Sequence, residues 1–187
     1  MDTLLLKIKT GIDRLNKWIG EMVSWFSLLL VLLVCFNVVM RYVFNISLKW
    51  ENELEWHVFS LLFLLAGGYT LLENKHVRVD VFYTKFSAKN RALTELIGTL
   101  AFLLPWASII LYYSFLYFWD SFLLKEGSPD PGGLKAWYWG KLAIFLGFFL
   151  LFLQGISTFI KAYLALKSGD FSHYEESVES HSFTDNA

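Results

Sequence analysis

The sequence predicts an all-α integral membrane protein with four transmembrane helices. Of its 187 residues, 56% are hydrophobic and only 18% are charged. The apolar residues gather in four runs without any charged residue or His, at 22–40, 58–72, 96–119 and 142–160. Small soluble domains cannot bury runs of this length, because much of their surface stays in water. The solvent of these runs is therefore expected to be lipid.

The chain begins with a basic amphipathic segment. Apolar residues recur at three- and four-residue steps from Leu4 to Ile19, with Lys7, Lys9, Arg14 and Lys17 between them. This pattern is typical of a helix on the cytoplasmic membrane face, or of a helical extension of the first span. The segment is too long and too charged for a cleavable signal peptide, so the first span is expected to remain as an anchor.

Four spans are expected, at about 19–43, 52–73, 95–119 and 138–162. Three of the apolar runs reach the roughly 18 residues that crossing requires, whereas 58–72 must be extended backwards past Glu55 and His57. Together they form a predicted membrane domain at 1–168. The Ser-rich, acidic residues 169–187 are expected to be a disordered tail.

Small residues and a proline suggest how the last two spans pack. Pro105 deprives the carbonyl of Ala101 of its helical hydrogen bond, which predicts a bend there. Two helical stripes rich in small residues are expected to be surfaces for packing within the chain. They are Gly98, Ala101, Pro105, Ser108 and Tyr112 in the third span, and Ala143, Gly147 and Gly155 in the fourth.

The charge distribution predicts that both termini are cytoplasmic. Of the 16 Lys and Arg residues, 11 lie before the first span, after the second or after the fourth, and 5 lie in the other two loops. The positive-inside rule assigns the richer side to the cytoplasm. The net charge of −1 gives no reason to expect a nucleic-acid partner.

No constellation typical of an enzyme, cofactor or metal site is evident in the sequence. Cys35 is the only cysteine, and His57 is the only histidine near a span, so a haem held between two histidines is not expected. A membrane anchor of a respiratory oxidoreductase nevertheless remains the alternative function. A homo-oligomeric channel is disfavoured because no span carries a long polar stripe.

Residues 50–57 form the most polar cluster at a membrane entry. On a helix, Glu51 and Glu55 share one face, while Glu53 and His57 lie nearly opposite. For Glu51 and Glu55, one interpretation is a solvated first turn favoured by the helix dipole. Glu53 is expected to be buried against a cationic group of this chain or of a partner, because an acid near lipid is costly unless paired. Arg41 is the candidate within the chain.

A second polar cluster follows the second span. If residues 74–80 are extended, His76, Arg78 and Asp80 alternate onto one face. The spacing is compatible with a positively charged loop that holds the topology. A metal site is disfavoured because no further ligands stand nearby.

These motifs together resemble the small membrane subunit (DctQ-like) of tripartite ATP-independent periplasmic (TRAP) transporters. The matching segments are Arg41-Tyr-Val-Phe-Asn-Ile-Ser47, Trp50-x-x-Glu53-Leu54, Gly67-Gly68, His76-Val-Arg-Val-Asp80 and Asp130-Pro-Gly-Gly-Leu134 before Trp137. The chain departs from the family where a basic residue often follows the glutamate by one turn, since Trp56-His57 stand there.

The resemblance implies a scaffold subunit of a secondary, ion-gradient-driven transporter in the bacterial inner membrane. It would work with a large membrane subunit, which would hold the sodium and solute sites, and with a periplasmic substrate-binding protein. The solute would be a small organic compound, such as an organic acid. The motif residues would then be structural or interface positions rather than solute ligands: Arg41, Trp50, Glu53, Gly67, His76, Arg78 and Asp80.

Overall fold

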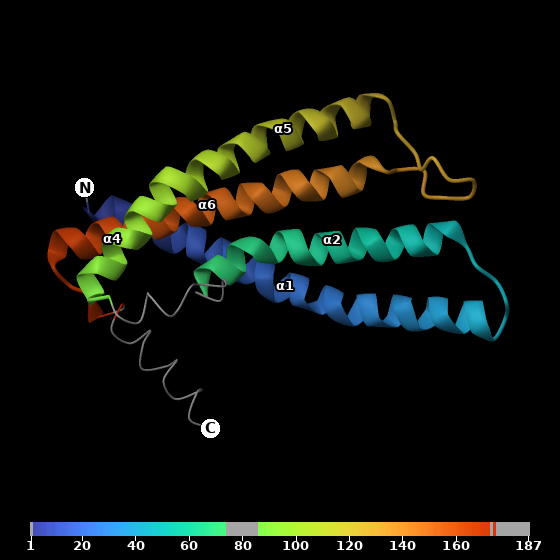
Figure 1. Ribbon diagram of the computed structural model, residues 1–187, viewed down its shortest axis with the longest axis horizontal. Coiled ribbons are helices and arrows are strands. Elements are labelled where there is room, and N and C mark those ends of the chain that lie inside the picture. The colour runs from blue at the N-terminus through green and yellow to red at the C-terminus, as the bar shows by residue number, and fades with distance from the viewer. Residues whose placement is uncertain (1, 74–85, 173, 175–187) are drawn as a thin grey trace, which may run out of the picture.

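The computed structural model of the chain describes residues 2–73, 86–172 and 174, and this part is built from helices (Figure 1). Four helical stretches are long and apolar enough to cross a membrane, which confirms the predicted fold class. In chain order the elements are α1 (Asp2–Tyr42), α2 (Lys49–Leu72), α4 (Ala88–Gly98), the π-helical turn η1 (Thr99–Leu103), α5 (Leu104–Leu123) and α6 (Tyr138–Ser168).

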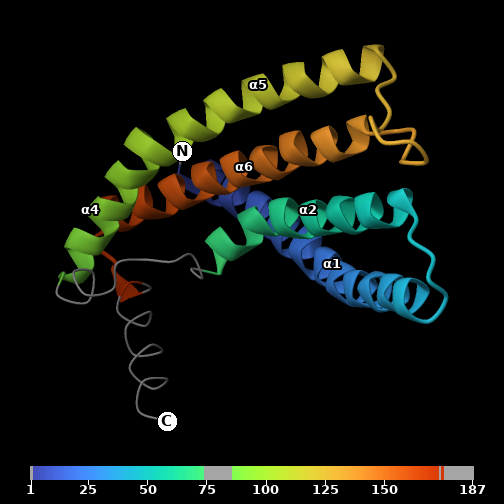
Figure 2. The same cartoon turned by 45° about the vertical axis from the view of Figure 1, so that its right-hand side comes forward.

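The long helices lie side by side in the order α1, α2, α6 and α5, in both Figure 1 and Figure 2. α6 is the central element and packs against α1, α2, α4 and α5. Of the 18 most apolar consecutive residues in each spanning stretch, 44% are buried in α6, against 6–11% in the other three stretches. The arrangement is therefore an open layer, with most apolar side chains left to face lipid or another protein.

α1 is one continuous helix of 41 residues. At 1.5 Å per residue it is about 60 Å long, roughly twice the thickness of the hydrocarbon core. Of the two alternatives for the basic segment, the structure has the helical extension of the first span. Toward its N-terminus α1 passes behind α6 (Figure 1).

The helix of the third span changes direction between α4 and α5 (Figures 1 and 2). The predicted bend near Ala101 falls inside η1, where the Leu104 N–H donates to the Thr99 carbonyl oxygen. Pro105 follows within the first turn of α5. A wider π-type turn accommodates a proline because it redirects the hydrogen bonds that the ring would break.

Close helix contacts depend on glycines in α1, α2 and α6. A Cβ on Gly147 would meet Leu64, one on Gly20 would meet Tyr69, and one on Gly68 would meet Asn16 and the Leu150 carbonyl. The prediction that the small residues of the fourth span pack within the chain agrees with these contacts. For the third span it was wrong: Gly98 faces open space, and the rest of that stripe, Ala101, Pro105, Ser108 and Tyr112, is exposed.

A polar network joins α1 to α6 near Gly68. The fully buried Asn16 side chain donates to Gln154 Oε1 at 3.0 Å. Asp13 accepts from Gln154 Nε2 at 3.0 Å and from Ser157 Oγ at 2.5 Å, and it also pairs with Lys9 at 2.8 Å. Hydrogen bonds between helices hold membrane proteins together where lipid provides no hydrophobic drive.

Candidate functional site at the loop that contacts Glu53

Glu53 connects α2 to the loop between α5 and α6, residues 124–137. Its side chain is 8% exposed, and its two carboxylate oxygens accept from the Ser128 hydroxyl and from the Leu134 backbone N–H, the latter at 2.6 Å. A carboxylate that accepts two such bonds is stabilised without a cation. The prediction that Glu53 is buried agrees with this position, but its hydrogen-bond partners are a neutral hydroxyl and a backbone amide.

The loop folds back on itself to present these donors. The Ser128 N–H donates to the Leu134 carbonyl at 2.8 Å, and the Gly133 N–H donates to the Asp130 carbonyl at 3.1 Å. Gly132 has φ of +81°, a conformation that favours glycine. A Cβ on Gly133 would collide with both Ser128 and Glu53, so the Pro-Gly-Gly segment allows the loop to close on the carboxylate.

A second connection fixes the base of the loop. Lys141 Nζ lies 2.5 Å from Glu126 Oε2, which also accepts from the Ser121 hydroxyl, and the ammonium lies 3.9 Å from the centre of the Tyr117 ring. The Lys141 ammonium, with help from Ser121, lowers the pKa of the Glu126 carboxyl below its usual value. Both ends of the loop are therefore tied to neighbouring helices.

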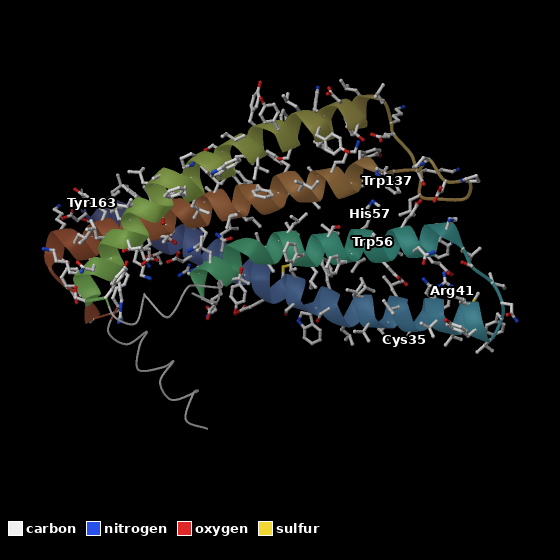
Figure 3. All side chains as sticks on the ribbon, viewed as in Figure 1. Cys35, Arg41, Trp56, His57, Trp137 and Tyr163 are labelled. Carbon is white, nitrogen blue, oxygen red and sulfur yellow. The ribbon has the colours of Figure 1, made fainter. Side chains whose placement is uncertain are left out.

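His57 lies one turn after Glu53 and faces Trp137, as Figure 3 shows. Its Nδ1 is 2.6 Å from the Glu53 carbonyl oxygen and so is assigned as the donor, and its ring meets Trp137 edge-on at 5.4 Å between centroids. Nε2 is buried against Gly140 and has no hydrogen-bond partner among the described residues. The ring is held as a packing element between α2 and α6.

Arg41 does not pair with Glu53. It is exposed near the end of α1, away from the loop that contacts Glu53 (Figure 3). The face of α2 that meets α1 instead carries Asn52 and Glu55, which accept from Asn37 Nδ2 at 2.8 and 2.9 Å. Glu53 lies on another face of the helix, so an Arg41–Glu53 pair within this chain was the wrong expectation.

The interpretation of Glu51 and Glu55 as a solvated turn was also wrong. Glu51 is 4% exposed, and neither carboxylate oxygen has a hydrogen-bond partner among the described residues. Glu55 is half-buried and bonded to Asn37. The polar residues of this turn lie between helices rather than in water.

Two of the remaining predicted interface positions, Trp50 and Gly67, lie within the described residues. Trp50 is 39% exposed at the start of α2, and a Cβ on Gly67 would meet nothing within 4 Å. Gly68, its neighbour, makes the close contact instead. His76, Arg78 and Asp80 lie outside the described residues.

Sequence reasoning missed the residues that connect α1 to α6. Asp13 and Asn16 share a face of the basic segment, and Gln154 interrupts the apolar run of the fourth span. A polar residue within such a run is a signal for an interhelical partner, because an unpaired amide in lipid is costly. That signal could have singled out Gln154, although not its partners.

A known family model matches the second to fourth spans and the last part of the first. The model of the DctQ component of tripartite ATP-independent periplasmic transporters matches residues 30–164, which include most of α2 to α6 and the loop that contacts Glu53. The chain belongs to this family. It is a multi-pass inner-membrane protein of a transporter family, and the oxidoreductase anchor is not favoured.

One curated DctQ relative also matches. The chain is 27% identical, over 117 residues, to the C4-dicarboxylate TRAP transporter small permease protein DctQ of Vibrio cholerae serotype O1. The aligned part is 63% of this chain and 46% of the relative, so the chain spans about half the length of the curated relative it matches. No solved structure gives a significant match.

Proposed function

We propose that this DctQ-family chain is the small membrane subunit of a TRAP transporter and enlarges the fixed scaffold of a larger membrane subunit. The observation that carries the proposal is the family match over residues 30–164. The open layer supports it, since large apolar side chains such as Phe63, Phe102 and Trp106 are 63–70% exposed and available to lipid or to another membrane protein.

The large membrane subunit would hold the solute and the sodium ions that drive uptake. This chain would hold neither, and no cofactor. Glu53, Asp13 and Glu126 accept from its own loop, from α6 and from Lys141, and the described residues contain no group of three or more His, Cys, Asp or Glu that could hold a metal ion. The solute is proposed to be an organic acid, by analogy with the printed name of the Vibrio cholerae relative. A periplasmic substrate-binding protein would deliver it.

In this proposal both termini are cytoplasmic, by the asymmetry of the Lys and Arg residues. The loop that contacts Glu53 would then lie at the periplasmic surface. Its two anchors would keep it ordered where the binding protein arrives.

Co-purification tests the partnership. A tagged copy of this chain, co-expressed with a large TRAP subunit from the same organism, is expected to retain that subunit through detergent extraction and two affinity steps. An unrelated four-span membrane protein with the same tag is the control. Recovery of the large subunit at the level of that control would contradict the proposal.

A further inference from the structure

The extended N-terminal part of α1 carries two cations that form no ion pair with the described residues of the chain. Lys9 pairs with Asp13 at 2.8 Å, and Lys17 lies 4.0 Å from Glu21. Lys7 and Arg14 are exposed and form no ion pair with any residue in 2–73, 86–172 or 174. Their charge is therefore available to an external anion.

These two cations border one open groove. Thr3, Leu6, Thr10 and Gly11 complete its lining, and a Cβ on Gly11 would meet nothing within 4 Å. Gly11 stands four residues after Lys7 and three before Arg14, which is about 6 and 4.5 Å along the helix axis. Both long side chains can therefore reach an anion placed over Gly11.

The same face of α1 continues as an apolar stripe. At about 100° per residue, Lys7, Arg14, Trp18 and Trp25 lie within roughly 40° of one another. Trp18 is 58% exposed and Trp25 is 71% exposed. Asp13 and Asn16, which bind α6, occupy roughly the opposite face, so this stripe points away from the protein.

The order of groups along the stripe matches that of a phospholipid. Trp18 lies just before the uncharged run 22–40, at the expected membrane–water interface. An indole ring is favourable there. Arg14 is about 6 Å further out, close to the thickness of one headgroup layer. Trp25 is about 10 Å further in, at the depth of the acyl chains.

We propose that Lys7, Arg14, Trp18 and Trp25 form a binding site for one anionic phospholipid. The phosphate lies between Lys7 and Arg14 over Gly11, and an acyl chain lies along Trp18 and Trp25. The site would fix the depth and rotation of α1, whose opposite face carries the network to α6. This inference does not depend on the transport proposal.

Native mass spectrometry of the full chain in detergent, titrated with phosphatidylglycerol, tests the site. Lys7→Gln with Arg14→Gln should weaken retention of one lipid about 30-fold, because each basic residue near an anionic headgroup contributes about fivefold. The matched control is Lys17→Gln with Lys167→Gln, which removes two charges from the same end of the molecule but from cations paired with Glu21 and Asp2. That control should bind like the parent.

Two further comparisons identify the ligand. Trp25→Ala should weaken the binding of phosphatidylglycerol but not that of glycerol phosphate. The parent protein should bind phosphatidylcholine far more weakly than phosphatidylglycerol. An equal loss of phosphatidylglycerol binding in the two double variants would mean that only the net charge of this end of the molecule matters, and it would overturn the proposal. Binding of inorganic phosphate as tight as that of the lipid, or equal binding of both lipids, would also overturn it.

Discussion

Glu53 shows how one side chain can organise a distant segment. Its partners Ser128 and Leu134 lie 75 and 81 residues further along the chain. The resemblance to TRAP subunits rests on the Trp50-x-x-Glu53 motif and on the Asp130-Pro-Gly-Gly-Leu134 loop, and the structure brings these two motifs into direct contact. The glutamate and the glycines therefore form one structural unit.

Glu53→Gln is expected to loosen this unit. The amide oxygen of Gln can accept from the Leu134 N–H, but its NH2 can meet the Ser128 hydroxyl only as a donor. Both bonds also lose the negative charge that strengthens them in the parent. Trypsin should then cleave at the exposed Lys125 and Lys135 faster than in the parent protein in detergent. Asp120→Asn, an exposed acid at the same end of the molecule, is the control.

Cleavage of Glu53→Gln at the parental rate would mean that the carboxylate does not hold the loop.

The sequence allowed the burial of Glu53 to be predicted, but not its partners. The cost of an acid near lipid follows from residue type and depth alone. The partner could have been a cation, a hydroxyl or a backbone amide, and only the fold decides among these. Arg41 was the candidate because it stands at the end of the first span, on the same side of the membrane, whereas in the structure Asn37 meets α2 through Asn52 and Glu55.

At the scale of helices, the contacts of α6 with its neighbours organise the layer. The fourth span looked no more buried than the others from its composition, since apolar residues fill lipid-facing and protein-facing positions alike. Its small residues and Gln154 are the sequence signals of a central helix. In the third span, small residues such as Gly98 and Ser108 face outward, so small size alone did not predict packing within the chain.

Adjacent glycines in α2 provide a matched test of this packing. Gly68→Ala should destabilise the protein by about 1–3 kcal/mol, because the new methyl group would meet Asn16 and the Leu150 carbonyl. Gly67→Ala adds the same methyl group into open space and should be neutral or stabilising, by up to about 1 kcal/mol of helix propensity. Thermal unfolding in detergent measures both.

Equal stability of the two alanine variants would contradict the close approach of α1 and α6 to Gly68. A lower stability of Gly67→Ala than of Gly68→Ala would do so more strongly.

For the whole molecule, the proposed orientation predicts opposite reporter signals at two positions. A cytoplasmic reporter fused after Ala187 should be active, and the same reporter inserted within 127–133 should be inactive. A periplasmic reporter should give the reverse pattern. The same pattern at both positions would place them on one side of the membrane, which excludes the single span between them that the proposed topology requires.

The scaffold role is the central claim, and solute uptake tests it most directly. Cells that carry the large TRAP subunit and the cognate binding protein should take up the labelled organic acid only when this chain is also expressed. Without it, uptake is expected to fall to the level of cells that lack the large subunit, and a plasmid copy should restore it. Full uptake in the absence of this chain, with the large subunit at its normal abundance, would contradict the account.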